Sequence, residues 1–360
     1  MTNKARVVRF ATAGAPQVLA LETIDLADPA AGEVQVRQRA IGLNYMEVYH
    51  RSGYYPLPLP SGVGTEAAGV VERVGAGVTD FKVGNRVAYG SGVPGAYADL
   101  RNMPADRLIA IPEGIRDDEA AAILMKGMTV EYLLNRCYPL KAGEFALMYA
   151  AAGGIGLLAG QWGRHLGARM IGVASGAEKC QRACDNGYEF VIDRASEDIV
   201  ARVKEITGGA GVPVVYDSIG KATFDTSIKC LAPRGYFVSF GTTTGAPPPV
   251  EASLLQKSGS LYFTRPTLVT YCSARPDMLA SAAKVFELYK AGKLKSNIGK
   301  RYGLGDAVRA HTDLEAGNTT GASLLLPRQS TEIFPPLPRR REPGILSSHR
   351  INAGFPPARE

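Results

Sequence analysis

Residues 145–168 read FALMYAAAGGIGLLAGQWGRHLGA, and this stretch decides the fold. An apolar run leads straight into a loop of small residues, and an amphipathic pattern over 155–166 follows. A strand, a glycine-rich turn and a helix in this order predict a dinucleotide-binding unit, because a helix N-terminus attracts a pyrophosphate. Compared with Gly-x-Gly-x-x-Gly, the loop has Ala151, Gly153 and Gly156, so its first glycine has become alanine. The alternative is a purely structural tight turn.

Apolar and helical segments alternate after this stretch. Strands are expected over residues 170–174, 190–192, 213–216, 236–240 and 261–263. Helices are expected over residues 178–184, 196–207 and 224–231. Repeated strand-helix-strand units with almost continuously apolar strands predict a parallel sheet covered on both faces. We interpret this region as a Rossmann-type domain of the doubly wound α/β class.

The end of the second strand of this region bears on the choice of nicotinamide cofactor. An NAD-binding domain places an Asp or Glu there for the ribose 2′-hydroxyl, and no acid ends this strand. Ser175 is instead followed by Lys179, and Arg194 comes just after the third strand, so a hydroxyl and two cations can meet a 2′-phosphate. These residues predict that the cofactor is NADPH rather than NADH. Glu178 lies nearby, and the alternative is that both cations are solvated surface charges.

The N-terminal third of the chain consists of short β segments separated by Gly, Pro and Asp. Strands are expected over residues 5–10, 34–40, 67–74, 86–89 and 108–111. A helix is expected over 117–137, because acids lie in its first turn and Arg136 lies near its end. Beyond the Rossmann-type region, two more helices are expected over 276–291 and 306–315, followed by a short apolar run over 324–326.

Composition excludes several classes of protein. The 360 residues are 46% hydrophobic and 21% charged, which is typical of a globular chain with about two domains. No apolar run approaches the roughly 20 residues of a membrane helix, and the start lacks a secretory core, so we expect a cytoplasmic protein without a membrane partner. The net charge of +7 is spread along the chain, so we expect no nucleic acid partner. Five scattered cysteines indicate neither a disulfide framework nor a zinc ribbon.

Residues 328–360 differ from the rest of the chain. They are rich in proline and arginine and show no periodicity that could build a core. We expect them to be disordered. The alternatives are a solvated extension and a basic docking tail around residues 339–341.

Seven segments carry a resemblance to a known family: GLNYMEVYHRSGYY (42–55), SGVGTEAAGVVERVGAGV (61–78), LMKGMTVEYLL (124–134), AAAGGIG (150–156), VVYDSIG (214–220), VSFG (238–241) and GSLYFTRP (259–266). Together they resemble the NADPH:quinone oxidoreductase family, the zeta-crystallin-like, zinc-free branch of the medium-chain dehydrogenase/reductase superfamily. The resemblance runs from about residue 5 to Pro327 and does not cover the tail.

The resemblance implies an α/β architecture of two domains. A GroES-like, β-rich substrate domain would span 1–125 and be completed by 268–327, and a Rossmann NADPH-binding domain would span 126–267. Family members form homodimers by pairing their Rossmann domains, and their active site is the cleft between the two domains.

The resemblance also implies a site without metal. Zinc-dependent relatives have a cysteine ligand where residues 42–44 read Gly-Leu-Asn, and a Gly-His-Glu motif where residues 64–66 read Gly-Thr-Glu. Since no cysteine precedes Cys137, the four-cysteine structural zinc lobe is missing as well. We therefore expect no zinc and no alcohol dehydrogenation through a metal-bound alkoxide.

The family's cofactor contacts can be carried over by motif. Contacts at the nicotinamide end would be Asn44, Tyr55, Lys126 and Thr129. The pyrophosphate would be held by the glycine loop, through Ala152, Gly153, Gly154, Ile155 and Gly156. Ser175, Lys179 and Arg194 would meet the adenosine ribose phosphate, and the nicotinamide ribose and amide would be lined by Ser218, Phe240, Gly241, Thr242, Phe263 and Thr264.

Two positions depart from the family pattern. Relatives often have Tyr or His in place of Arg194, and this replacement keeps a phosphate donor. Some relatives have Arg in place of Gly317, and the loss of that cation would weaken cofactor binding.

The implied activity is hydride transfer from NADPH to a quinone. Quinones accept electrons readily, so the protein mainly supplies position, desolvation and a hydrogen bond from Tyr49, Tyr55 or Arg265 to the developing oxyanion. The alternative for these three residues is simple packing or bracing of a loop. Two other functions stay open: NADPH-dependent reduction of an enone or alkenal double bond, and a crystallin-like or RNA-binding role. The sequence does not identify the physiological electron acceptor. It also does not show whether one or two electrons are transferred at a time.

Overall fold

The computed structural model describes residues 3–327, and the predicted tail over 328–360 lies outside the described residues. In this range the chain forms three sheets, which we call A, B and C. None of the helices in residues 3–327 is both long and apolar enough to span a bilayer.

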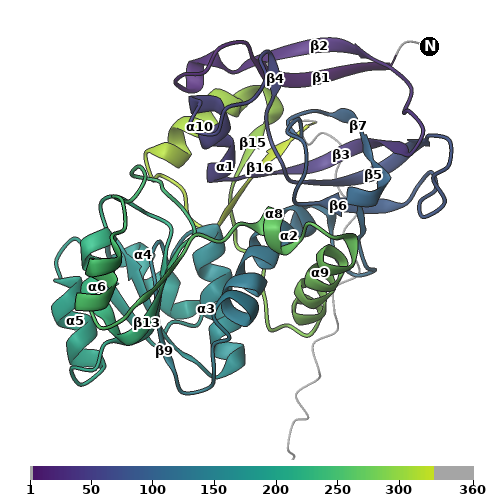
Figure 1. Cartoon of the computed structure of the whole chain (residues 1–360). Helices are drawn as coiled ribbons and strands as arrows, with labels where there is room; N and C mark the ends of the chain where they lie inside the picture. The colour runs from purple at the N-terminus through teal and green to yellow at the C-terminus, as the bar shows by residue number, and fades with distance from the viewer. Residues whose placement is uncertain (1–2, 328–360) are drawn as a thin grey trace, which may run out of the picture. The chain divides into compact units, whose positions relative to one another are not determined.

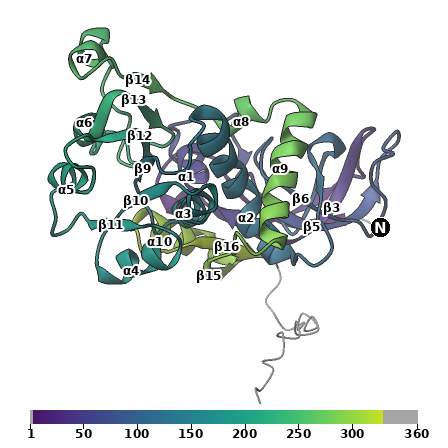
Figure 2. The ribbon, with the colours of Figure 1, turned by 90° about the horizontal axis from the view of Figure 1, so that it is seen from below.

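Sheet C is an all-parallel sheet of six strands in the order β11-β10-β9-β12-β13-β14, a row that Figure 2 shows from one edge to the other. Its strands are β9 (Phe145–Met148), β10 (Arg169–Ala174), β11 (Phe190–Asp193), β12 (Val212–Asp217), β13 (Leu231–Ser239) and β14 (Tyr262–Thr264). This is the strand order 3-2-1-4-5-6 of a Rossmann domain, which confirms the predicted fold class. The order reverses between β9 and β12, so the loops after these two strands flank the switch point where such folds bind ligands.

Both faces of sheet C are buried, as its apolar strands predicted. Along β9 the side chains of Ala146 and Met148 face one hydrophobic cluster, whereas Leu147 faces another. Helices cover the two faces: α3 (Gly154–Leu166) and α4 (Ala177–Asp185) belong to the first cluster, and α5 (Ile199–Ile206) and α6 (Phe224–Cys230) to the second. The short helix α7 (Ala252–Lys257) precedes the edge strand β14.

A third hydrophobic cluster lies at sheet B, whose strand order is β15-β16-β3-β5-β6-β8, with β7 also paired to β3. Its strands are β3 (Glu33–Leu43), β5 (Ala67–Val74), β6 (Arg86–Tyr89), β7 (Leu100–Pro104), β8 (Ile109–Ala110), β15 (Ile298–Gly303) and β16 (Ala322–Leu326). The chain therefore returns to this sheet near its C-terminal end. Two strands, as well as the expected helix α10 (Ala307–Glu315), come from that segment.

Sheet A and the remaining helices complete the fold. Sheet A pairs β1 (Asn3–Phe10) with β2 (Ala20–Leu26) and β4 (Ser61–Gly62). Helix α1 (Tyr45–Ser52) directly follows β3. The other helical segments are α8 (Leu268–Tyr271), α9 (Arg275–Lys290) and the single-turn helices at Pro16–Val18, Ala105–Arg107 and Leu304–Asp306.

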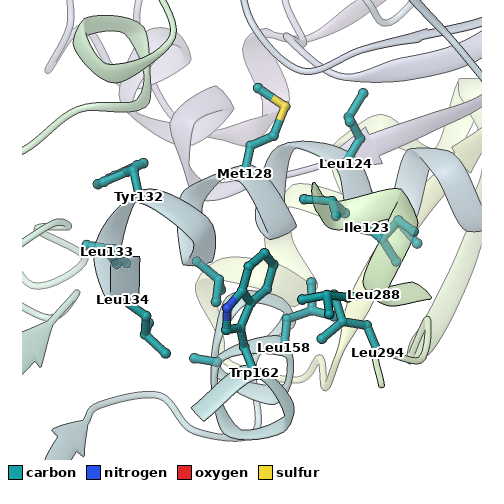
Figure 3. Close-up of a cluster of buried hydrophobic side chains, with 14 of the residues drawn as sticks. Ile123, Leu124, Met128, Tyr132, Leu133, Leu134, Leu158, Trp162, Leu288 and Leu294 are labelled. Atoms are coloured by element: carbon teal, nitrogen blue, oxygen red, sulfur yellow. The ribbon is translucent and has the colours of Figure 1, made fainter. Parts of the chain in front are cut away.

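Helix α2 (Asp117–Glu131) is buried along most of its length, and a π-helical turn over Tyr132–Cys137 ends it. Figures 1 and 2 both show α9 beside α2. Trp162 of α3 is 1% exposed and packs with Leu158, Leu288 and Leu294 next to α2 (Figure 3). This packing fixes α2 against α3, and through it the position of the side chains that α2 carries toward the nucleotide loop.

Candidate active site

The predicted nucleotide loop joins β9 to α3 at the switch point of sheet C. Gly153 is the N-cap of α3, so the first amides of the helix have no capping side chain in front of them. A Cβ on Gly156 would lie 2.2 Å from the carbonyl oxygen of Ala150 and 2.6 Å from that of Ala151. Ala150 itself has φ 52°, an uncommon conformation for a residue with a side chain. The loop thus depends on glycine at 156 and leaves a helix N-terminus open to an anion.

Lys126 of α2 reaches this loop from the opposite side. A Cβ on Gly154 would lie 2.9 Å from the Cδ atom of Lys126, so the lysine stem crosses the start of α3. The ammonium donates to Oε2 of Glu66 at 2.8 Å, and both side chains are buried. A buried charge of this kind is tolerable only when it is paired and hydrogen-bonded. Glu66 therefore holds Lys126 beside the predicted pyrophosphate site.

Two buried carboxylates fix Asn44, which begins α1. The Asn44 backbone N–H donates to Glu47 Oε2 at 2.6 Å, in the capping box of the helix. Its side-chain Nδ2 donates to Glu66 Oε2 at 3.0 Å. Because the amide nitrogen is committed to a carboxylate, the orientation of the Asn44 side chain is fixed. Gly42 makes room for this arrangement, since a Cβ there would lie 2.1 Å from Glu66 Oε2.

Glu47 is fully buried, and its carboxylate accepts from Asn44 and from both the N–H and the hydroxyl of Thr65, at 3.1 and 2.8 Å. Burial raises its pKa to about 7, although these hydrogen bonds and Lys126 act in the opposite direction. The neighbouring charge of Glu66 raises the pKa further. Folding therefore favours the protonated form of Glu47 over a wide pH range.

We expect a Glu47→Gln variant to lose the pH dependence that this carboxyl gives to stability. With a folded pKa above the ordinary 4.5, Glu47 contributes stability that is present below pH 4.5 and is lost as pH rises through 7. At 1.36 kcal/mol per pKa unit, that loss is on the order of 3 kcal/mol. Urea unfolding of both proteins at pH 5, 6, 7 and 8 should show the wild type losing stability relative to the variant as pH rises. Parallel profiles would contradict the raised pKa.

His311 also makes the stability depend on pH, but it does not affect this comparison. Burial lowers its pKa to about 3, so its contribution to stability is lost as pH falls below 6.5, the opposite sign to Glu47. This contribution is the same in wild type and variant, and it cancels in their difference.

The predicted substrate residues Tyr49, Tyr55 and Arg265 come together, although they are far apart in the sequence. The Tyr49 hydroxyl accepts from the backbone N–H of Thr242 at 2.8 Å. The Tyr55 hydroxyl accepts from Nη2 of Arg265 at 3.1 Å, while Nη1 of that arginine donates to the Ser239 carbonyl at 2.8 Å. Burial also raises the pKa of Tyr49. Each tyrosine accepts one hydrogen bond and keeps its own proton to donate.

The loop after β12 carries Ser218 and is held by Asp217. The Asp217 carboxylate is buried and accepts from two loop amides and two hydroxyls, at 2.7–3.0 Å, the donors being Ile219, Gly220, Thr223 and Ser227. A Cβ on Gly241 would lie 2.6 Å from the Ser218 carbonyl oxygen, so the two predicted residues are in backbone contact. The hydroxyls of Ser239 and Thr242 are buried there without a hydrogen-bond partner among residues 3–327. Orphaned buried hydroxyls at the carboxyl end of a strand fit a ligand that supplies their partners.

Two of the predicted 2′-phosphate residues, Ser175 and Arg194, lie in the turns after the adjacent strands β10 and β11, and Lys179 lies in α4. The Asp193 carboxylate at the end of β11 accepts from the amides of Gly176 and Ala195, at 3.0 Å each, and so joins these turns. These hydrogen bonds lower the pKa of Asp193. Lys179 donates to the Gly317 carbonyl oxygen at 2.8 Å, and Arg194 is exposed. Gly317, one of the two departures from the family pattern, thus contacts Lys179.

The remaining predicted residues have internal partners. The Thr129 hydroxyl donates to the Met125 carbonyl at 2.8 Å within α2. The ring of Phe263 packs 5.2 Å from that of Phe237, and Phe240 packs against the cluster around α2. Ala152 and Gly153 contact Gly321, and Ile155 and Thr264 are half-buried. The structure leaves the roles of these residues as predictions.

Four acidic residues that support the site were not among the predicted site residues: Glu47, Glu66, Asp193 and Asp217. Asp193 and Asp217 each end a parallel strand, and this position is a readable signal. Glu47 lies three residues after Asn44, the spacing of a capping box. Among residues 3–327, no group of three or more His, Cys, Asp or Glu side chains could hold a metal.

Comparison with known proteins shows to which family this architecture belongs. The family model of the alcohol dehydrogenase GroES-like domain matches residues 30–113, and that of the zinc-binding dehydrogenase matches residues 154–286. A quinone oxidoreductase from Pseudomonas aeruginosa is 47% identical over 324 residues, which is 90% of this chain and 100% of the relative. The chain belongs to the quinone oxidoreductase family. As a family member it has the two domain types of the medium-chain dehydrogenase/reductase superfamily, as the resemblance implied.

Two further relatives of this family member are a solved structure with a bound cofactor and an enzyme named for a different reaction. The crystal structure of Escherichia coli quinone oxidoreductase in complex with NADPH matches with a TM-score of 0.88 and 45% identity, over 89% of this chain and 100% of the other. A 2-haloacrylate reductase from a Burkholderia species is 41% identical over 88% of this chain and 97% of that protein.

Proposed function

We propose that this member of the quinone oxidoreductase family is an NADPH-dependent quinone reductase that works without zinc. The observation that carries the proposal is the pair of hydroxyls of Tyr49 and Tyr55. Each accepts from a donor in the segment that follows a strand of sheet C, Thr242 after β13 and Arg265 after β14, and keeps its own proton to donate. Such hydroxyls can stabilise the oxyanion that forms when a quinone carbonyl is reduced. The family's named activity and the NADPH complex of a 45% identical relative support the same conclusion.

The residues present fit NADPH. The open N-terminus of α3 and the approach of Lys126 to Gly154 suit a pyrophosphate. The orphaned hydroxyls of Ser239 and Thr242 suit polar groups of the nicotinamide end. Lys179 offers a cation, whose ammonium donates to the Gly317 carbonyl in this structure.

The protein's part in the reaction is to position and to stabilise charge. When bound, NADPH supplies a hydride, and solvent supplies the single proton that completes the hydroquinone. Tyr49 and Tyr55 donate hydrogen bonds to the carbonyl oxygen, and Arg265 fixes Tyr55 while it adds a positive charge nearby. Buried Lys126 and half-buried Asn44, both fixed by Glu66, orient the cofactor. No proton donor stronger than a tyrosine is needed, because quinones have a high intrinsic electron affinity.

The first test is oxidation of the cofactor, followed by its absorbance, with 1,4-benzoquinone and with NADPH or NADH. We expect turnover with a clear preference for NADPH in kcat/KM. Lys179→Ala should reduce that preference by about 10-fold, because a charge-assisted hydrogen bond contributes about 1.5–3 kcal/mol and part of it is screened at the surface. Equal use of both cofactors by the wild type would contradict the 2′-phosphate site.

A second candidate activity is reduction of an activated carbon–carbon double bond. It is favoured by the 41% identity to a 2-haloacrylate reductase. Parallel kinetics on 1,4-benzoquinone and a 2-alkenal distinguish the two, because the better-fitting substrate has the larger kcat/KM.

The proposal extends to the protein's assembly and location. We place a homodimer contact at β14, the edge strand of sheet C, whose outer backbone groups are unpaired among residues 3–327. Tyr262 of this strand is 53% exposed and stacks 4.5 Å from Tyr236, so it presents an aromatic surface to a second copy. A cytoplasmic location and the domain boundaries at residues 125 and 267 belong to the same proposal.

A further inference from the structure

Four tyrosines gather where α1 meets the loop that follows it. Tyr49 lies at the centre, with ring centroids 5.4 Å from Tyr45, 5.3 Å from Tyr55 and 5.4 Å from Tyr54. Tyr54 and Tyr55 are 5.0 Å apart. Aromatic rings at these separations attract one another and hold a defined arrangement.

The hydroxyl of Tyr54 differs from those of the other three. Tyr45, Tyr49 and Tyr55 each form a hydrogen bond with a segment that follows a strand of sheet C, through Thr243, Thr242 and Arg265 respectively. The Tyr54 hydroxyl forms no hydrogen bond within residues 3–327, and 44% of the residue is exposed, against 8% for Tyr49. Tyr54 thus offers a ring surface at the outer side of the predicted substrate residues.

The backbone on both sides of Tyr54 is fixed. Gly53 ends α1 with φ 83°, and its N–H bonds to the His50 carbonyl. The Tyr55 N–H bonds to the Tyr49 carbonyl at 3.0 Å, and Pro56 follows. A side chain held in this way loses little entropy when a ligand packs on it.

We propose that Tyr54 selects the acceptor, by stacking on the outer ring of a planar fused-ring quinone whose carbonyl faces Tyr49 and Tyr55. This inference rests on the proposed function and adds a residue that determines its specificity. A fused-ring quinone carries aromatic surface that a single-ring quinone lacks. The ring of Tyr54, whose centroid is 5.4 Å from that of Tyr49 and 5.0 Å from that of Tyr55, is the exposed member of the cluster on which this surface can stack.

The test compares kcat/KM for 9,10-phenanthrenequinone with kcat/KM for 1,4-benzoquinone, at saturating NADPH. An aromatic pair contributes about 0.5–1.5 kcal/mol, which is about a 2- to 10-fold effect on a rate constant. We expect Tyr54→Ala to lower the ratio of the two values by that factor. Tyr54→Phe should keep the ratio, because it retains the ring and loses only an unbonded hydroxyl.

Leu59→Ala is the matched control, because Leu59 lies five residues further along the same loop and is similarly exposed, at 45%. It should leave the ratio unchanged. An unchanged ratio in Tyr54→Ala, or an equal loss in Tyr54→Phe, overturns the role of Tyr54 while quinone reduction stands. Failure of the wild type to reduce either quinone overturns the proposed function itself, so the two failures are distinguishable.

Discussion

Replacing Gly156 by alanine is expected to lower kcat/KM for NADPH by on the order of 100-fold, the cost of misplacing a reactant by about 1 Å. The new Cβ would lie 2.2 Å from the Ala150 carbonyl oxygen and 2.6 Å from that of Ala151. Both obstacles are backbone atoms, so no side-chain rotation relieves the clash. Ala150 already has a positive φ, which leaves the loop little freedom to move elsewhere. Steady-state kinetics with varied NADPH and a direct binding titration measure the effect.

Gly153→Ala is the control for this prediction. It lies in the same loop, but its φ of −79° suits any residue, and its Cβ would be 3.2 Å from the Ala150 carbonyl oxygen. We expect a much smaller loss of NADPH affinity. Circular dichroism should show both variants folded, with Gly156→Ala destabilised by about 1–3 kcal/mol of overpacking. Full NADPH affinity in Gly156→Ala would show that the cofactor does not depend on the shape of this loop.

Local patterns predicted the elements of this fold well where the chain is apolar. The strand Ala67–Val74 and the strand Arg86–Tyr89 have the expected bounds, and sheet C follows the predicted alternation. The helix Tyr45–Ser52 was not predicted, although it carries Tyr49. Eight residues are too few for a helix to be stable on its own, and this one depends on its capping box, on Gly53 and on tertiary packing.

The site shows a sharper limit of sequence reasoning. The family resemblance named Asn44, Lys126 and Tyr49, but not what holds them. Glu66 is 60 residues away from Lys126 and Tyr49 is 193 residues away from Thr242, and neither pairing leaves a periodic trace in the sequence. In the sequence, a buried acidic residue cannot be distinguished from an exposed one until its partner is known. For this reason the positioning residues appeared only with the fold.

Glu66→Ala is expected to be the most destabilising change at the site, with a loss of about 3–5 kcal/mol in the free energy of unfolding. It removes the partner of the Lys126 ammonium, whose side chain is 6% exposed. It also deprives the Asn44 side chain and the Met125 amide of their acceptor. Urea unfolding at pH 7 measures the loss. The variant should also bind NADPH more weakly, because Lys126 and Asn44 are no longer fixed.

The double variant Glu66→Ala with Lys126→Met separates the charge from the packing. If the loss comes mainly from an unpaired buried ammonium, removing that ammonium restores part of the stability, and the double variant is more stable than Glu66→Ala alone. Recovery of stability without recovery of NADPH affinity would assign to Lys126 a direct role in binding the cofactor. Additive losses would instead mean that the pair contributes little as a pair, and that Glu66 acts through Asn44 and Met125.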